Sequence, residues 1–335
     1  MKPVIHALSG PKLTADEAAF FTECDPAGYI LFKRNVESRD QLRALTDSLR
    51  DLSGRDDLPI LIDQEGGRVA RMQPPEWPAF PAPAVFDALY DIAPASAIQA
   101  ARAHAQALGM MLSEVGITVD ALPLLDIVRP ETSNVIGDRA LGSEPLRVAA
   151  LGRAVIDGLR RGGVVGIVKH IPGHGRAVVD SHKELPVVDA DAAALETDLV
   201  PFTTLKDAPM AMTAHVVYDA WDADRPATLS PTVIHDIIRG QIGFTGLLMS
   251  DDLDMKALTG GAGEKAAAAI AAGCDLALEC WARMDEMTDI ANALDDIAPA
   301  SRDRLDAAMA TIADGGEQAD FDDLIATRDT LLALA

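Results

Sequence analysis

One short segment of the chain concentrates residue types that can move protons. The segment "KHIPGHGRAVVDSH", residues 169–182, contains three histidines, two basic residues and one acid. Histidine titrates near neutral pH and is therefore suited to general acid and base work. In an extended segment Asp180 and His182 would face the same side, so the carboxylate could stabilise the imidazolium. On spacing alone, a hydrogen bond that only stabilises the loop is the simpler interpretation.

The same segment could also be read as a metal site or a phosphate loop. His170 and His174 are four residues apart, a spacing that places two ligands on one face of a helix. Pro172 and Gly173 lie between them and make a helix improbable there. Neither an HExxH motif nor a GxxxxGK[ST] motif occurs in the chain. We therefore expect neither a metal ion nor a cofactor.

A second candidate for chemistry is the segment "SDDLDM", residues 250–255. It begins at Ser250, the last residue of an apolar run over residues 244–250. Asp251 follows Ser250 directly, where a strand end would present its side chain to a ligand, whereas Asp252 could cap the next segment. A carboxylate nucleophile with a separate proton donor is what retaining glycoside hydrolysis requires. A carboxylate also suits an aldolase-like or a metal-dependent barrel, so these residues alone leave the reaction open.

The elements that must position these residues follow a regular alternation. Continuous apolar runs without a polar alternation are typical of parallel strands buried on both faces. Amphipathic segments at 38–51, 96–115, 143–161 and 261–272 lie between such runs. The alternation predicts an α/β fold, a single-domain (β/α)₈ barrel over residues 1–335, with a doubly wound open sheet as the alternative. The eight runs are 4–8, 28–32, 59–63, 117–122, 164–169, 209–214, 244–250 and 274–278.

Polar motifs follow most of the predicted strands. "DQEGGRVAR", "LPLLDI", "KHIPGHG", "AHVVYD" and "SDDLDM" come after the third to seventh runs, while "EC" after the eighth is expected to contribute less. An aspartate at a strand end often only caps the next helix. Function in a barrel nevertheless lies at the carboxyl ends of its strands, so this concentration predicts a site at one barrel mouth.

Composition narrows the class of partner. The chain carries 52 acidic against 29 basic residues and a formal net charge of −23, which disfavours nucleic acid or an anionic membrane as its main partner. No segment has the apolar length of a membrane span, and the N-terminal residues lack the pattern of a secretory signal. Three cysteines suit a reducing compartment better than a disulfide framework. We expect a cytoplasmic monomer that binds a small molecule.

Taken together and in order, five motifs resemble a known family. They are "DQEGGRVAR", "NVIGDRALG", "KHIPGHG…DSH", "AMTAHVVYD…PATLS" and "SDDLDM", and they resemble the bacterial β-N-acetylglucosaminidases of glycoside hydrolase family three, enzymes of cell-wall recycling. The resemblance covers roughly residues 1–300. It implies an exo-acting, retaining enzyme that removes terminal N-acetylglucosamine from cytosolic peptidoglycan fragments. The implied substrate is N-acetylglucosaminyl-1,6-anhydro-N-acetylmuramic acid, with or without peptide.

The resemblance also implies roles for individual residues. Asp251 corresponds to the nucleophile, His182 to the acid/base, and Asp180 to the carboxylate that supports this histidine. The residues that match the family's sugar-binding positions are Asp63, Arg71, Arg139, Lys169 and His170. Carboxylates accept hydrogen bonds from sugar hydroxyls and basic side chains donate to them, which agrees with this set.

Three positions depart from the family pattern. Ile171 stands where Phe is usual, Arg176-Ala177 where Asp-Thr is usual, and Asp254 where Ser is usual. None of these changes removes a catalytic group. Two other functions remain as alternatives: a family-three β-glucosidase or β-xylosidase, and a sugar-binding barrel without catalysis. The length of the chain argues against the first, and the presence of both Asp251 and His182 argues against the second.

Overall fold

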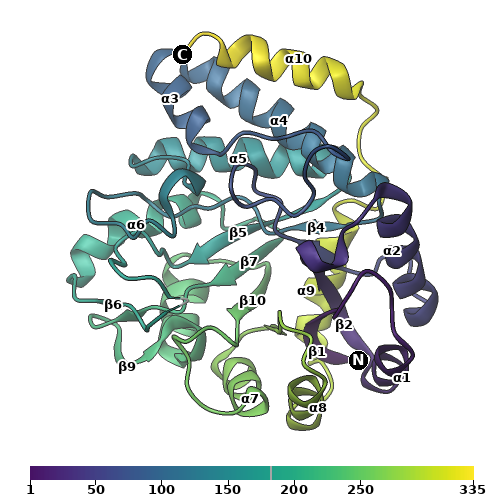
Figure 1. The fold of residues 1–335 in the computed structure, drawn as a ribbon. Coiled ribbons are helices and arrows are strands. Elements are labelled where there is room, and N and C mark those ends of the chain that lie inside the picture. The colour runs from purple at the N-terminus through teal and green to yellow at the C-terminus, as the bar shows by residue number, and fades with distance from the viewer. Residues whose placement is uncertain (182) are drawn as a thin grey trace.

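The computed structural model describes residues 1–181 and 183–335. In these residues eight parallel strands close into a barrel in the order β1-β11-β10-β7-β5-β4-β3-β2 (Figure 1). Each of the eight predicted apolar runs overlaps one of the strands, so the predicted (β/α)₈ barrel is confirmed and the open sheet is wrong. The strands are β1 (Lys2–Ala7), β2 (Pro26–Leu31), β3 (Ile60–Ile62), β4 (Val119–Asp120), β5 (Val165–Ile171), β7 (Met210–Thr213), β10 (Leu247–Asp252) and β11 (Leu276–Leu278).

The four predicted helical segments are helices in the structure. They are α2 (Arg39–Ser53), α4 (Pro94–Glu114), α5 (Pro145–Arg161) and α7 (Ala262–Ala272). The hydroxyl of Ser38 caps α2 by accepting from the amide of Gln41 at 3.3 Å. Helix α5 stops at Gly162, and Gly163 then takes a positive φ of 83° that favours glycine.

Further helices complete the outer layer. They are α1 (Ala15–Cys24), α3 (Ala84–Ile92), α6 (Ala192–Thr204), α8 (Met284–Ala293), α9 (Pro299–Ala310) and α10 (Phe321–Leu332), with η4 (Val233–Gln241) between β7 and β10 and short turns η1 (Lys33–Asn35), η2 (Gly137–Arg139) and η3 (Ala227–Leu229). Helix α10 runs across α3 and α4 at the edge of the molecule (Figure 1). None of the described helices is long and apolar enough to cross a membrane.

A small second sheet was not expected from the sequence. It consists of β6 (Val187–Val188), β8 (Val217–Tyr218) and β9 (Asp222–Pro226), in the order β6-β8-β9. Strands of two residues leave no periodic pattern that a sequence could reveal. The sheet ties the end of the loop that follows β5 to the segment that follows β7.

Two apolar clusters hold the barrel. An inner cluster, which includes Ile5, Leu61 and Val165, fills the barrel, and an outer cluster lies between the strands and the helices. In the outer layer, helices α4 and α5 approach each other closely. A Cβ atom on Gly158 would lie 2.5 Å from the carbonyl oxygen of Arg102, so only glycine permits this approach.

Candidate active site

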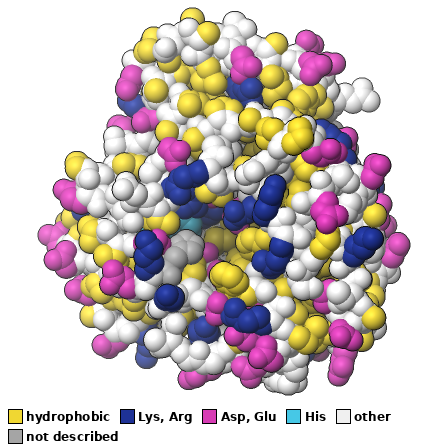
Figure 2. Space-filling view, in the orientation of Figure 1, with side chains coloured by type: hydrophobic (Ala, Val, Ile, Leu, Met, Phe, Trp, Pro, Cys, Tyr) yellow, Lys and Arg dark blue, Asp and Glu magenta, His cyan; other side chains and the backbone are white. Residues whose placement is uncertain are grey.

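A pocket with a cavity of about 350 Å³ opens at the carboxyl ends of the barrel strands. Six of the residues predicted for the site line it: Asp63, Arg71, Arg139, Lys169, His170 and Asp251. Basic side chains gather around a hollow near the centre of this face, although the protein as a whole is acidic (Figure 2). The barrel therefore brings together residues that are up to 188 positions apart in the sequence (Asp63 to Asp251).

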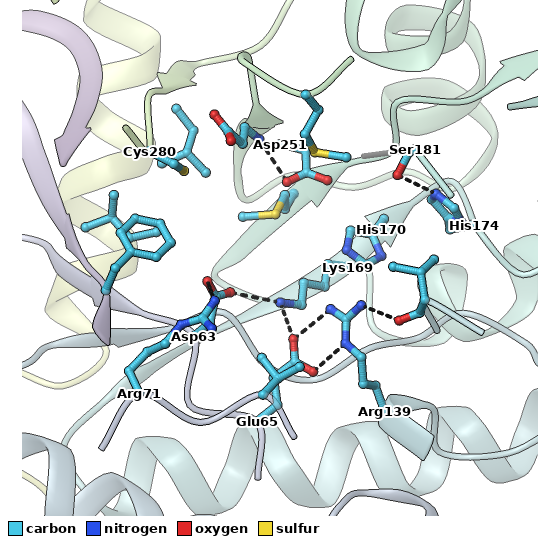
Figure 3. A pocket seen from close by; sticks show the side chains of 18 of the residues that line it. Asp63, Glu65, Arg71, Arg139, Lys169, His170, His174, Ser181, Asp251 and Cys280 are labelled. Carbon is cyan, nitrogen blue, oxygen red and sulfur yellow. Dashed lines mark hydrogen bonds and ion pairs between the residues drawn. The ribbon is translucent and has the colours of Figure 1, made fainter. Parts of the chain in front are cut away.

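Three cations and two carboxylates form a network on one wall (Figure 3). The Nζ atom of Lys169 lies 2.7 Å from Glu65 Oε1 and 3.3 Å from Asp63 Oδ1. Arg71 donates to Asp63 Oδ2 at 3.0 Å, and Arg139 donates to both oxygens of Glu65 at 2.7 and 2.8 Å. Such fixed, charge-assisted pairs hold each side chain in one orientation.

The network stays charged at neutral pH. Burial alone would raise the pKa of Asp63, but Lys169 and Arg71 lower it well below its usual range. Burial would likewise raise the pKa of Glu65, and Lys169 and Arg139 lower it. The pKa of Lys169 is raised despite burial because Glu65 and Asp63 surround it. The wall thus offers fixed donors and acceptors for a polyhydroxylated ligand.

Glu65 was not singled out from the sequence. It lies in the "DQEGG" segment, two residues after Asp63, and its side chain is fully buried. The motif was recognised, but nothing in its spacing distinguishes a buried partner of two cations from an exposed acid.

His170 is held by a second residue that the sequence analysis did not name. Its Nδ1 atom lies 2.7 Å from Asp126 Oδ2, and the backbone amides of His170 and His174 donate to Asp126 Oδ1 at 3.2 and 2.6 Å. Asp126 comes from the "LPLLDI" motif after β4. Its carboxylate fixes the ring of His170 and the course of the loop together.

Asp251 is the penultimate residue of β10, is half-buried and lines the pocket. Its Oδ1 atom accepts the backbone amide of Asp252 at 2.8 Å. Burial alone would raise the pKa of Asp251, but His215, His170 and the amide of Asp252 lower it, so the group is a carboxylate at neutral pH. The ring of His215 lies between Thr228 Oγ1 at 2.7 Å and the carbonyl of Asp252 at 2.9 Å. The motifs "AMTAH" and "PATLS" therefore meet next to the strand end that carries Asp251.

The predicted pairing of Asp180 with His182 stays a prediction, because His182 lies outside the described residues. The carbonyl of Asp180 accepts from the amides of Lys183 and Glu184. The neighbouring Ser181 lines the pocket, and its hydroxyl lies 3.2 Å from Nε2 of His174.

The residues in the described part of the chain do not form a metal site. No group of three or more His, Cys, Asp or Glu side chains is arranged there to hold a metal ion. The reason is visible at the network, where Asp63 and Glu65 already face Lys169 and the two arginines.

The three departures from the family pattern fall outside the pocket lining that the structure describes. Ile171 is fully buried in β5. Arg176 pairs with Asp198 and donates to the carbonyl of Ala194 at 2.8 Å. Asp254 pairs with Arg283 at 2.9 Å. Each substitution thus has a partner or a packing site of its own.

The segment after β11 also contributes to the pocket. Cys280 and Trp281 line it, and only Cys280 of these two lies in the "EC" segment, which was expected to contribute less. The buried carboxylate of Glu279 bends the chain toward the pocket by accepting the amides of Trp281 and Ala282, both at 2.6 Å. Arg34, in the turn η1 after β2, also lines the pocket and was not predicted.

Comparisons with known proteins agree with this geometry. Residues 4–314 match the glycosyl hydrolase family 3 N-terminal domain. The β-hexosaminidase of Alkalilimnicola ehrlichii is 42% identical over 287 residues, which are 83% of this chain and 80% of that protein. The β-hexosaminidase of Chromobacterium violaceum is 39% identical over 339 residues, 99% of this chain and 92% of that protein.

A solved structure is similar along its whole length. NagZ from Neisseria gonorrhoeae in complex with N-trifluoroacetyl-D-glucosamine superimposes with a TM-score of 0.87 at 31% identity, covering 100% of this chain and 98% of that one. The barrel, the pocket at its mouth and the matched residues lead to one conclusion: this chain belongs to glycosyl hydrolase family 3.

Proposed function

We propose that this glycoside hydrolase is a cytoplasmic, exo-acting and retaining β-N-acetylglucosaminidase. The observation that carries the proposal is the position of Asp251, an ionised carboxylate in the same pocket as the network of Asp63, Glu65 and Lys169. The network suits the hydroxyls of one terminal sugar, and the carboxylate suits its anomeric carbon. The names of the relatives, β-hexosaminidase in both cases, support the N-acetylated sugar class.

The proposed reaction has two steps. In the first, an oxygen of Asp251 bonds to the anomeric carbon, the glycosidic bond breaks, and His182 gives its proton to the leaving oxygen. In the second, His182 takes a proton from water, the water oxygen bonds to the anomeric carbon, and the Asp251 carboxylate is released. Asp180 supports the imidazolium form of His182, from which the first step starts and to which the second step returns.

The proposed substrate is a cytosolic peptidoglycan fragment, N-acetylglucosaminyl-1,6-anhydro-N-acetylmuramic acid with or without peptide. Support comes from the NagZ-like structure and from the pocket, whose cavity of about 350 Å³ lies at the small end of the range for ligand sites. A pocket of this size suits one terminal sugar better than an internal stretch of polymer.

A panel of aryl β-glycosides tests the proposed activity. We expect hydrolysis of 4-nitrophenyl N-acetyl-β-glucosaminide with kcat/KM at least tenfold above that of the matching glucoside and xyloside. A higher value for the glucoside or xyloside would assign the chain to those activities. If none of the three glycosides is hydrolysed, the remaining interpretation is a sugar-binding barrel without catalysis.

Labelling tests the nucleophile. A slow fluorosugar substrate should leave its sugar on the peptide that contains Asp251, and fragmentation in the mass spectrometer locates the modified residue. Asp251→Ala should lose nearly all activity and keep the circular dichroism spectrum of the wild type. A label on Asp252 would overturn the assignment.

A further inference from the structure

Gln64 lies between two members of the charged network and points away from them. Its chain neighbours Asp63 and Glu65 both line the pocket and both reach Lys169 (Figure 3), whereas Gln64 is not part of the described pocket lining. Successive side chains of an extended segment point to opposite sides, so Gln64 lies behind the pocket wall. Its side chain is buried there, with 1% of its surface exposed.

The side chain of Gln64 closes the loop that follows β3. Its Oε1 atom accepts the backbone amides of Arg71 at 2.8 Å and Met72 at 2.9 Å. Its Nε2 atom donates to the carbonyl of Met72 at 2.9 Å. Buried backbone groups need partners of this kind. These three hydrogen bonds form a clamp that ties the backbone of Arg71 to the end of the strand.

The clamp is attached to the barrel wall at its other end. Asp120, the last residue of β4, accepts the backbone amide of Gln64 at 2.9 Å through Oδ1 and is fully buried. Strands β3 and β4 are paired in the barrel. Within the loop, the amide of Glu65 also donates to the carbonyl of Val69 at 2.8 Å. The barrel wall therefore fixes the position of Gln64, and Gln64 fixes the position of the loop.

The side chain of Arg71 makes few contacts of its own. Its Nη2 atom donates to Asp63 Oδ2 at 3.0 Å, and its guanidinium lies 5.5 Å from the ring of Phe32. Its Nε atom is buried and has no hydrogen-bond partner among the described residues. The direction of this side chain therefore depends on where its backbone lies. A displacement of about 1 Å in a group that orients a substrate can lower the rate about 100-fold.

We propose that Gln64 positions Arg71 for the terminal sugar without touching the sugar itself. The clamp holds the backbone of Arg71, so the guanidinium stays where it can donate to the sugar hydroxyls. Gln64 is thus a positioning residue, and its effect on the reaction passes through Arg71. This inference rests on the proposed function, because it presumes that Arg71 binds a terminal N-acetylglucosamine.

Gln64→Met tests the proposal, because methionine keeps the length of the side chain and removes its polar atoms. We expect kcat/KM for 4-nitrophenyl N-acetyl-β-glucosaminide to fall about tenfold, mostly through KM, since a hydrogen bond from a charged group is worth about one such factor. The inhibition constant of free N-acetylglucosamine should rise by a similar factor. The loss should be equal for N,N′-diacetylchitobiose, because proton transfer to the leaving group is not altered.

Gln106→Met is the matched control. Gln106 is a buried glutamine on α4, in the outer layer and outside the described pocket lining. The same exchange there should leave kcat/KM and the inhibition constant within about twofold of the wild type. Urea unfolding of both variants shows how much stability each exchange removes. If Gln64→Met does not fold, Gln64→Asn replaces it, because asparagine keeps the amide, is one methylene too short for the clamp and should weaken binding in the same way.

A double-mutant cycle tests whether the effect passes through Arg71. Binding of free N-acetylglucosamine, followed by nuclear magnetic resonance titration, requires no turnover and can be compared in the wild type, Gln64→Met, Arg71→Ala and the double variant. We expect Gln64→Met to weaken binding by less than about twofold once Arg71 is absent, because residues that act as one unit are not additive.

The outcomes separate the inference from the proposed function. Wild-type protein that hydrolyses no N-acetylglucosaminide overturns the proposed function, and this inference with it. An active wild type with unchanged kinetics in Gln64→Met overturns the inference alone, and so does an equal kinetic loss in Gln106→Met. Fully additive losses in the double variant would show that Gln64 does not act through Arg71 and would also overturn it.

Discussion

The pKa values of single residues in this pocket depend on burial and on the charges around them. Asp251 and Asp252 are adjacent in the chain, yet the positive surroundings of Asp251 lower its pKa, whereas burial and the neighbouring Asp251 raise the pKa of Asp252 to about 7. Two carboxyl groups with separated pKa values are the usual signature of an acid and a nucleophile. Asp252 is therefore the physical competitor of His182 for the role of proton donor.

The first prediction decides between them by the leaving group. A nitrophenolate leaves almost unaided, but a sugar alkoxide needs a proton. We expect His182→Ala to lose ~10²–10⁴-fold in the glycosylation rate on a disaccharide and far less on a nitrophenyl glycoside. Added azide should restore turnover of the activated substrate, since azide needs no base. Pre-steady-state kinetics on both substrates measure this, and Asp180→Asn should show a milder form of the defect.

Asp252→Asn is the matched control for that experiment. It keeps the size of the side chain and an acceptor for Trp281, and it should preserve the ratio of rates between the two leaving groups. If Asp252→Asn showed the leaving-group dependence and His182→Ala did not, the proton donor would be Asp252.

The second prediction concerns stability and pH at Asp252. Because its pKa is raised from 3.8 to about 7 on folding, the folded protein binds an extra proton between about pH 4 and pH 7. Stability contributed by this group therefore falls as pH rises through that window. The surrounding charges are those of Asp251, Glu279 and Arg34, with the indole of Trp281 and the amide of Asp254 bonded to its oxygens.

Asparagine does not titrate. As pH rises across the window, the free energy of unfolding of Asp252→Asn should therefore increase relative to that of the wild type by on the order of 1 kcal/mol per pH unit. Urea unfolding at pH 4.5, 6 and 8 measures the difference. Asp51→Asn, which removes an exposed carboxylate on the surface, is the control variant. An equal difference at all three pH values would mean that Asp252 is ionised in the folded protein.

At the scale of elements, the long pair α4 and α5 supports the side of the barrel that carries β4 and β5. Their close approach depends on glycines at the contact, Gly109, Gly158 and Gly162, each of which faces backbone atoms of the other helix. Helix packing at this distance leaves no room for a methyl group. The network residue Lys169 and the ring of His170 both lie on β5, so this contact lies behind the site.

The third prediction follows from that contact. Alanine is the better helix former by about 0.5–1 kcal/mol, but its methyl at position 158 would lie 2.5 Å from a backbone oxygen. We expect Gly158→Ala to lower the free energy of unfolding by about 1–3 kcal/mol, as overpacking does. Guanidinium denaturation measures it. Gly10→Ala, at a site with nothing within 4 Å of the new methyl, should change stability by less than about 0.5 kcal/mol. A stabilised Gly158→Ala would show that the helices can separate without loss.

At the scale of the whole molecule, charge is segregated. The chain carries a net charge of −23, and yet the pocket is lined by Arg34, Arg68, Arg71, Arg139 and Lys169. Most of these cations face carboxylates inside the pocket, so the site is held together by its own ion pairs. A divalent cation would have to displace Lys169 or an arginine to reach Asp63 or Glu65.

The fourth prediction is that activity does not depend on a metal ion. Exhaustive dialysis against a chelator should leave kcat/KM for 4-nitrophenyl N-acetyl-β-glucosaminide and the unfolding temperature unchanged. Metal analysis of the dialysed protein confirms removal. A large loss of rate that added zinc restores would contradict the prediction and make one of the pocket acids or histidines a ligand.

The sequence by itself determined the architecture and the location of the site. Continuous apolar runs at eight positions specify strands buried on both faces, and polar motifs directly after them specify the mouth of the barrel. The family resemblance of the ordered motifs assigned Asp63, Arg71, Arg139, Lys169, His170 and Asp251 to that site, and the structure brings all six to one pocket.

Only the tertiary structure decided which side chains pair. Glu65 meets Arg139 across 74 positions, Asp126 meets His170 across 44, and Arg34 meets the carbonyl of Cys280 across 246. Such pairs depend on the stagger of neighbouring strands and on the loops between them, which no local periodicity records. The same is true of Trp281: in the sequence it is one apolar residue after a strand, and only the closed barrel leaves its ring exposed at the pocket rim.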